Sequence, residues 1–241
     1  MNTYTDLLTL YCVCYGDKVP LDKQFNQKSI MAGSFDLDNQ RRDELRNQHF
    51  VFDDEGSNIS NLNYAFGDLT ATYWIWKNSK EEFVGTNQYR RFWNESEIDL
   101  SELNDKTIYV SKYDSQHIPV SVLDQYRACH GNLGLVILNE LFGKDGFQLE
   151  KNLFYKLENT RELTSCNMFF AHKDVYDRFC ELLFSILFDV YEKGKDRIDE
   201  LVGYDKRLIA FLSERIITSL IYNRDHYFGD LGVKAITYRQ L

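Results

Sequence analysis

Stretches of apolar and polar residues along the chain predict a succession of strands and helices. The apolar run 7–15 predicts a buried strand, and the Gly16-Asp17 pair after it predicts a turn at a sheet edge that can border a pocket. The polar stretch 22–47 predicts a loop with a short helix. Further strands are expected at 50–52, at 82–85 with a polar and aromatic continuation over 87–93, at 108–111 and at 165–171.

Apolar residues that recur at helical spacing predict the helices. The first runs from Ser60, a residue type suited to an N-cap, to Asn78. Residues 120–142 predict a helix in two pieces, broken near Gly131 and Gly134. The strongest helical patterns cover 175–191 and 207–222. Strands that alternate with helices indicate an α/β fold.

Composition and charge exclude some classes of protein. The 241 residues suit one folded domain, with 44% hydrophobic and 27% charged residues and no linker or repeat. A formal charge of −9 argues against nucleic-acid binding, since phosphate-backbone binders carry an excess of Lys and Arg. An anionic substrate must therefore meet a local cationic group, and Arg90-Arg91 is the main candidate.

The cysteines and the start of the chain bear on its compartment. Five cysteines without paired CxxC spacing favour neither a zinc site nor a disulfide framework, so we expect a reducing cytosol. Strand alternation places Cys12 and Cys14 on one face as small buried hydrophobic residues. The start has no basic segment typical of a signal peptide, and no run reaches the length of a membrane span. Any membrane association is therefore expected to be peripheral.

Three cationic side chains, Lys77, Arg90 and Arg91, fall near predicted loops at the sheet edge. A guanidinium group presents a planar fork of donors that suits a diphosphate. Adjacent residues of an extended segment point to opposite sides, so we expect only one arginine to face a pocket. The alternative is a solvated pair that forms surface ion pairs with the Glu81-Glu82 region.

Aromatic and polar side chains around these cations give further candidates. Trp74 lies off the apolar stripe of its helix, and it or Tyr89 could stack on a nucleobase or sugar. The acidic loop 53–60 offers oxygen ligands for a hard cation, although such loops are often only solvated. Asn58 and Asn63 could bind sugar hydroxyl groups.

The second half of the chain contains two candidates for acid and base chemistry. His130 stands beside the expected helix break, where a general base or a purely structural histidine would fit. Glu214 and Arg215 are consecutive within the last long helix. An ion pair that braces the fold is the alternative to a catalytic role for Glu214.

Four sequence blocks occur in an order that resembles a known family. They are the segment NIS…LTATYWIWKN…YRRFW, then QYRACH, CNMFF and RLIAFLSERI, and together they extend over most of the chain. The chain resembles the uncharacterised-domain family of bacterial capsular polysaccharide and O-antigen glycosyltransferases. Two positions depart from the family pattern: Gln88 replaces the usual His before YRR, and Asp68 replaces the usual Glu. Both departures put a catalytic role at those positions in doubt.

The resemblance implies a GT-A-like fold, with a Rossmann-like mixed sheet flanked by helices and a C-terminal helical portion. It implies one domain over 1–241, with a nucleotide-sugar half at 1–115 and an acceptor-side, helical half at 116–241. Ordinary GT-A enzymes carry a DxD metal motif where this chain has Gln88 to Arg91. A guanidinium group can replace the metal cation on the diphosphate, which implies metal-independent or weakly Mg/Mn-dependent transfer.

The same resemblance implies the reaction and the roles. A hexosyl group, with either ring form of galactose as the leading donor, would pass from a UDP-sugar to a lipid-linked oligosaccharide at the inner face of the cytoplasmic membrane. His130, Glu214 and Asp68 are the catalytic candidates. The substrate-binding candidates are Asn58, Ser60, Asn63, Trp74, Lys77, Tyr89, Arg90, Arg91, Asn167 and Arg215.

Two other classes of function remain open at the level of sequence. A non-catalytic carbohydrate-binding or assembly subunit of a polysaccharide complex would keep the aromatic residues without an acid or base. A phosphosugar transferase or hydrolase could use a similar sheet. The lack of a DxD motif or an unambiguous carboxylate pair keeps both alternatives open.

Overall fold

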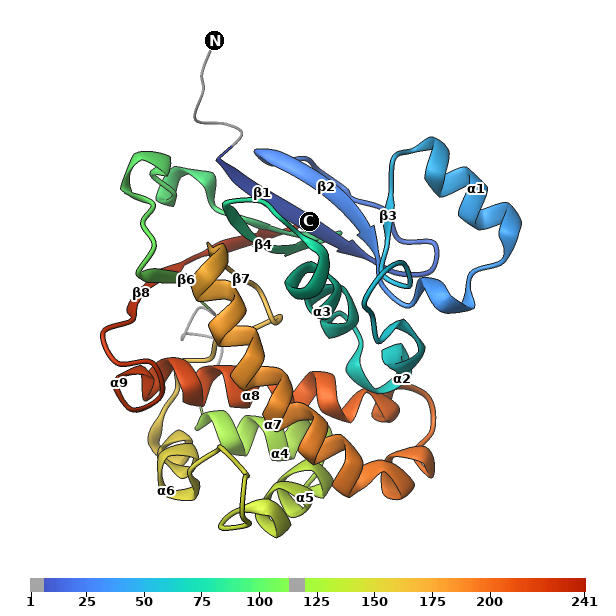
Figure 1. The fold of residues 1–241 in the computed structure, drawn as a ribbon. Helices are drawn as coiled ribbons and strands as arrows, with labels where there is room; N and C mark the ends of the chain where they lie inside the picture. The colour runs from blue at the N-terminus through green and yellow to red at the C-terminus, as the bar shows by residue number, and fades with distance from the viewer. Residues whose placement is uncertain (1–6, 113–119) are drawn as a thin grey trace.

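A mixed sheet forms the upper part of the molecule in Figure 1, and most of the helices gather below and in front of it. The computed structural model describes residues 7–112 and 120–241, so the expected boundary between the halves at 115/116 lies outside the described residues. The strands that form the sheet are β1 (Leu8–Cys14), β2 (Asn26–Met31), β3 (Val51–Phe52), β4 (Phe83–Gln88), β5 (Arg91–Trp93), β6 (Thr107–Ser111), β7 (Phe169–His172), β8 (Gly232–Ile236) and β9 (Tyr238–Gln240).

Strand β1 lies between β2 and β4 at the point where the chain changes direction across the sheet. The order β3-β2-β1-β4-β7-β6-β8 places β2 and β3 on one side of β1, and the chain then returns to form β4 on the other side. These four strands are parallel, so their carboxyl ends share one edge. Open α/β sheets bind ligands in the crevice at such a switch point. Strand β7 runs antiparallel to β4 and β6, and β5 forms a hairpin with β4.

Most predicted strands are confirmed, and the differences have physical causes. The loop expected over 22–47 contains β2, a strand that the pattern concealed because only Ile30 and Met31 are buried in it. The strand expected from Ser165 begins at Phe169, because Cys166 and Asn167 have positive φ and form a turn. Strands β8 and β9 were not predicted.

The helices follow the predicted pattern, with differences at Gly67 and Gly134. The expected helix 60–78 is a short 3-10 turn followed by α2 and α3, interrupted at Gly67, whose φ is 53°. The break at Gly131 is confirmed, whereas Gly134 lies inside a helix against the Tyr126 hydroxyl. The helices are α1 (Asn39–Asn47), α2 (Asn63–Phe66), α3 (Leu69–Asn78), α4 (Val122–His130), α5 (Leu133–Leu141), α6 (Lys151–Phe154), α7 (Lys173–Asp199), α8 (Leu208–Tyr222) and α9 (Arg224–Tyr227).

The main core lies between the sheet and the helices. Helix α7 packs against β4, β6 and β7 as well as α3, α5 and α8. Strand β1 alternates, with Tyr11 and Val13 in this core and Leu10, Cys12 and Cys14 on the opposite face. The prediction that the two cysteines share a buried face is confirmed, and both are free thiols.

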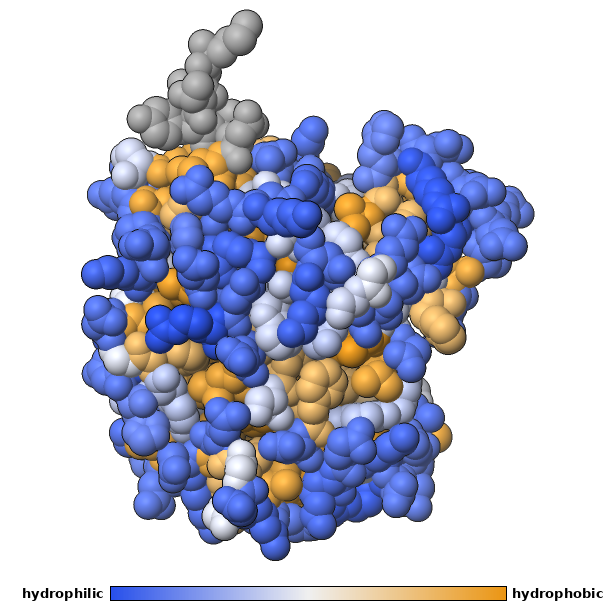
Figure 2. Space-filling view, viewed as in Figure 1, coloured by the Kyte–Doolittle hydropathy of each residue, from blue (hydrophilic) through white to orange (hydrophobic). Residues whose placement is uncertain are grey.

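The face of the molecule drawn in Figure 2 is mostly hydrophilic, with hydrophobic residues exposed in small separate groups. Within residues 7–112 and 120–241, none of the helices combines the length and hydrophobicity that crossing a bilayer requires.

The acidic loop after β3 forms hydrogen bonds with other segments of the chain. The Asp53 carboxylate accepts hydrogen bonds from the backbone N–H groups of Gly33 and Ser34, each at 2.9 Å, and from the Ser60 hydroxyl at 2.5 Å. These contacts tie together the segments that follow β2 and β3. Among the described residues, no group of three His, Cys, Asp or Glu is placed to hold a metal ion.

Candidate functional site

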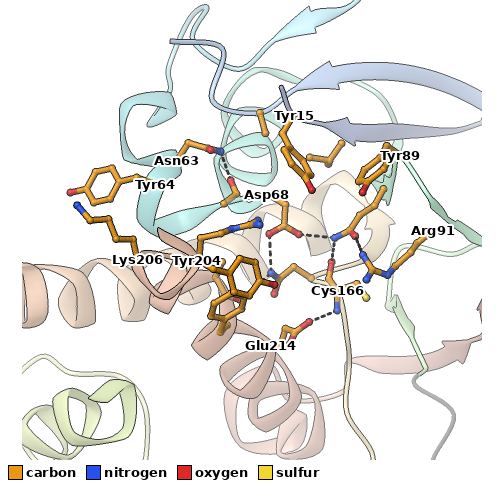
Figure 3. A pocket seen from close by; sticks show the side chains of 18 of the residues that line it. Tyr15, Asn63, Tyr64, Asp68, Tyr89, Arg91, Cys166, Tyr204, Lys206 and Glu214 are labelled. Atoms are coloured by element: carbon orange, nitrogen blue, oxygen red, sulfur yellow. Dashed lines mark hydrogen bonds between the residues drawn. The ribbon is translucent and has the colours of Figure 1, made fainter. Parts of the chain in front are cut away.

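A cavity of about 500 Å³, here called the main cavity, lies at the carboxyl ends of β1, β2 and β4. Figure 3 shows Asp68 in its middle, with Tyr15 and Tyr89 above, Tyr64 and Lys206 to the left and Glu214 below. The lining residues are Val13, Tyr15, Ala32, Asn63, Tyr64, Gly67, Asp68, Gln88, Tyr89, Arg90, Arg91, Cys166, Asn167, Gly203, Tyr204, Lys206, Arg207, Ala210, Phe211 and Glu214.

Arg90 and Arg91 both line the main cavity, which corrects the expectation that only one could. Gln88 pairs with Arg91 across the β4–β5 hairpin, so Arg90 belongs to a tight turn and strand alternation does not apply there. Arg91 donates a 2.5 Å hydrogen bond to the side-chain oxygen of Gln88. The Nε atoms of both arginines are buried without an acceptor among the described residues. Both arginines line the cavity, and a guanidinium group suits an anionic ligand.

The ion pairs expected as the alternative for these arginines do not form within the described residues. Glu81 instead binds Lys28 at 2.5 Å and the Tyr11 hydroxyl at 2.9 Å. Those contacts occupy the Glu81 carboxylate. Glu81 lies just before β4, whereas the hairpin turn follows it. The two arginines are thus part of the cavity wall and are not a solvated surface pair.

A third guanidinium group, from Arg207, enters the main cavity from the segment before α8. A Cβ atom at Gly67 would lie 2.5 Å from Arg207 Nη2, so the absence of a side chain at Gly67 makes room for this arginine. Its guanidinium carbon lies 5.9 Å from the Tyr15 ring centre and 5.7 Å from that of Tyr204. The sequence pattern did not reveal Arg207, because it reads as an ordinary residue at a helix start.

The Asp68 carboxylate is held at the break between α2 and α3 by two amides. Gln88 Nε2 donates to Oδ2 at 2.9 Å, and Asn167 Nδ2 donates to Oδ1 at 3.2 Å. Burial raises the pKa of Asp68, while the positive charge of Arg207 and these two donors oppose the rise. Asp68 and Gln88, the two departures from the family pattern, are therefore direct partners in space.

The Glu214 carboxylate fixes the turn before β7. It accepts hydrogen bonds from the Cys166 backbone N–H and from Arg215 Nη1, each at 2.6 Å. Burial raises its pKa, and the charge of Arg215 opposes that effect. Cys166 and Asn167 have φ of 64° and 51°, and left-handed backbone at a cysteine costs on the order of 1 kcal/mol or more. Side-chain contacts around the cavity thus hold a strained turn in place, as is common in functional sites.

Aromatic rings surround the cavity, and most of them escaped the sequence prediction. Tyr89 lies edge to face with Tyr15, with ring centres 5.6 Å apart, at the ends of β4 and β1. The expectation that the first strand ends at a pocket is confirmed by Tyr15, which directly follows it. Tyr204, from the segment before α8, is 64% exposed at the rim.

Two predicted donor-binding residues, Asn58 and Ser60, lie outside the main cavity. The Asn58 amide donates to the backbone oxygens of Asp54 and Gly56, both at 2.9 Å, and so closes its own loop. The Ser60 hydroxyl is buried against Asp53 and is not an N-cap.

Trp74 and Lys77 also lie away from the main cavity, whereas Asn63 lines it. The Trp74 indole N–H donates to the backbone oxygen of Glu55 at 2.6 Å. The Lys77 ammonium nitrogen lies 3.2 Å from the ring centre of Trp76, on the outer face of α3. Neither side chain reaches the place that the resemblance gave to the donor.

His130 and Arg215 are separated from the main cavity by Phe211. His130 stacks on Phe211 with ring centres 4.1 Å apart. Burial lowers the His130 pKa to about 4, with a further contribution from the charge of Arg215. Arg215 is buried, donates to the Phe211 backbone oxygen at 2.9 Å and pairs with Glu214. The expected bracing ion pair is therefore present.

The open mixed α/β sheet, with its cavity at the carboxyl ends of β1 and β4, has the predicted architecture, and the similarity to a solved glycosyltransferase given below confirms the GT-A-like fold class. The chain belongs to the family described as "Domain of unknown function (DUF4422)", which matches residues 37–225. Its fold is similar to that of WbbM, a bifunctional glycosyltransferase solved in the apo form, with a TM-score of 0.72 and 21% identity over 97% of this chain. The chain spans 45% of the length of that protein. No curated protein matches it in sequence.

The His130 environment predicts how stability depends on pH. The unfolded chain takes up a proton at His130 below its ordinary pKa of 6.5, while the folded chain resists protonation until about pH 4. Stability contributed by neutral His130 is therefore complete above pH 6.5 and decreases as the pH falls from there toward 4. Thermal unfolding at about pH 7.5 and about pH 5 should differ less in His130→Gln than in the wild type.

The matched control is His226→Gln, at an exposed position on α9. This variant should keep the wild-type difference between the two pH values. An unchanged difference in His130→Gln would show that burial at His130 does not oppose its protonation.

Proposed function

We propose that this chain transfers a hexosyl group from a UDP-sugar to a lipid-linked oligosaccharide during capsule or O-antigen synthesis. The observation that carries the proposal is the main cavity, where three guanidinium groups and two carboxylates line the same space. Transfer from a nucleotide sugar requires cations for the departing diphosphate and a base for the acceptor hydroxyl. The GT-A-like fold and the four sequence blocks support the same reaction.

The diphosphate of the donor would lie against Arg90 and Arg91, with Arg207 as a further cation. Arginine stays charged at any working pH and can give two parallel hydrogen bonds to phosphate oxygens. Tyr15 and Tyr89 would supply flat faces for the uracil ring. The family resemblance makes galactose, as pyranose or furanose, the first donor to test.

Asp68 is the proposed catalytic base. In the transfer, the acceptor oxygen bonds to the anomeric carbon, the bond from that carbon to the UDP oxygen breaks, and the hydroxyl proton passes to a carboxylate. Two amides orient the Asp68 carboxylate, and burial raises its pKa toward the range of an effective base. Glu214 would act indirectly, because it holds the backbone turn that carries Asn167, an Asp68 partner.

Transfer is proposed to be metal-independent or only weakly dependent on Mg or Mn. The resemblance places a DxD metal motif of ordinary GT-A enzymes at the end of β4, where this chain has the hairpin with Arg90 and Arg91. Fixed guanidinium groups can stabilise the developing negative charge on the diphosphate in place of a divalent cation.

A lipid-linked acceptor implies that the protein works at the inner face of the cytoplasmic membrane. Peripheral association is proposed, with the acceptor reaching the main cavity past its exposed rim, where Tyr64, Tyr204 and Lys206 lie. The negative net charge speaks against a nucleic-acid partner.

Arg90→Ala is expected to weaken donor binding by about tenfold or more, because a charge-assisted hydrogen bond contributes roughly 1.5–3 kcal/mol. A thermal-shift screen of nucleotide sugars on both proteins measures this, with the largest stabilisation expected from a UDP-sugar. Arg46→Ala, which removes an exposed guanidinium from α1, is the control and should bind as the wild type does. Equal stabilisation of wild type and Arg90→Ala would refute the role of Arg90.

The reaction itself predicts that UDP release depends on an acceptor. With lipid-linked oligosaccharides extracted from the source bacterium, UDP should form far faster than by donor hydrolysis alone, and excess chelator should leave the rate largely unchanged.

Asp68→Asn should lower kcat by about a hundredfold or more, because it removes the base. Asp43→Asn, on the exposed side of α1, should not change kcat.

Two results would count against this account of the reaction. Donor binding without acceptor-dependent UDP release would favour the non-catalytic carbohydrate-binding subunit. A rate restored only by manganese or magnesium after chelation would contradict transfer without a metal.

A further inference from the structure

A second cavity, of about 310 Å³, lies next to the main cavity. Phe211 lines both cavities, so one aromatic ring forms part of the wall between them. The apolar part of the second cavity includes Leu133, Leu201 and Leu208, and its polar part includes His130 and Asp205. The volume is at the lower end of the range of small-molecule sites.

An aromatic row connects the two cavities. Tyr204 in the main cavity lies 4.8 Å from the Phe211 ring centre, and His130 in the second cavity lies 4.1 Å from it on nearly parallel planes, 14° apart. Because His130 covers one face of Phe211, the two rings form one aromatic wall and are not separate stacking platforms. The second cavity therefore adjoins the main cavity across Phe211.

The polar groups of the second cavity suit hydroxyl groups and disfavour phosphate. The His130 imidazole is neutral at ordinary pH, because burial lowers its pKa to about 4, so it offers one donor and one acceptor. The Asp205 carboxylate is exposed at this cavity and accepts hydrogen bonds from hydroxyl groups. A negative charge at this position repels an anionic ligand.

We propose that the second cavity binds a neutral sugar unit of the acceptor glycan, next to the unit that receives the hexosyl group. His130 and Asp205 bind its hydroxyl groups, and its apolar face packs against the leucine side chains of the cavity. This inference rests on the proposed transfer reaction, which supplies the acceptor. It assigns His130 to acceptor binding and leaves the proton transfer to Asp68.

Alkylation of individual cysteines tests the inference without any transfer assay. Cys129 lines the second cavity and is exposed, and Cys166 lines the main cavity, while Cys12, Cys14 and Cys180 are buried internal controls. The protein is treated with N-ethylmaleimide alone, with a panel of neutral di- and trisaccharides of hexose and N-acetylhexosamine units, or with UDP. Peptide mass spectrometry then gives the alkylation rate at each cysteine.

At least one saccharide should slow alkylation of Cys129 by about threefold or more, the slowing that corresponds to occupation of two thirds of the sites. Asp205→Ala, at an exposed position, should lose this protection. Asp225→Ala, another exposed aspartate, should keep it. Failure of every saccharide to protect Cys129 would overturn the inference, and so would full protection in Asp205→Ala.

UDP separates this inference from the proposed function. UDP should slow alkylation of Cys166 and leave Cys129 unaffected. If saccharides protect Cys129 while UDP protects neither cysteine, the saccharide site stands and the donor site of the proposed function fails. If UDP protects Cys129, the second cavity belongs to the donor and the inference is overturned.

Discussion

The carboxylate of Asp68 joins parts of the chain that are distant in sequence, and the geometry of the main cavity depends on it. Gln88 at the end of β4 and Asn167 before β7 each donate one hydrogen bond to it. Gln88 also donates to the Cys166 backbone oxygen at 2.8 Å, so the same contacts restrain the strained turn. A buried carboxylate is costly unless its oxygens are satisfied. The two amides and the charge of Arg207 offset part of that cost, and burial still leaves the pKa of Asp68 raised.

The sequence predicted the strands and helices that carry this site better than it predicted the residues that line it. Strand β1, helix α8 and the pocket at the end of β1 follow from apolar runs, because periodicity reports burial. Arg90 and Arg91 were identified as cations, but their common orientation depends on the hairpin turn, which strand alternation does not describe. Arg207 was missed because its place is set by Gly67, a contact between residues far apart in sequence.

Several side chains that the sequence suggested as ligand-binding groups form hydrogen bonds with other groups of the protein. Trp74 and Asn58 satisfy backbone groups of the loop before α2. Ser60 and Asp53 bind each other, and neither lines the main cavity. Each of these polar groups lies in or against the loop after β3, and a single sequence does not distinguish a loop that binds a ligand from one whose polar groups bind one another. The side chains that line the main cavity differ from these loop side chains because they come from several elements that are distant in sequence.

The central claim is that arginine side chains in the main cavity bind the diphosphate of a nucleotide-sugar donor. A crystal structure of the chain with UDP and magnesium tests it most directly. The account predicts phosphate oxygens within hydrogen-bond distance of Arg90 or Arg91 and of Arg207, with the uracil ring near Tyr89. Phosphates bound outside the main cavity would contradict it. Phosphates held only by a metal ion on Asp68 or Glu214, away from the arginines, would contradict it as well.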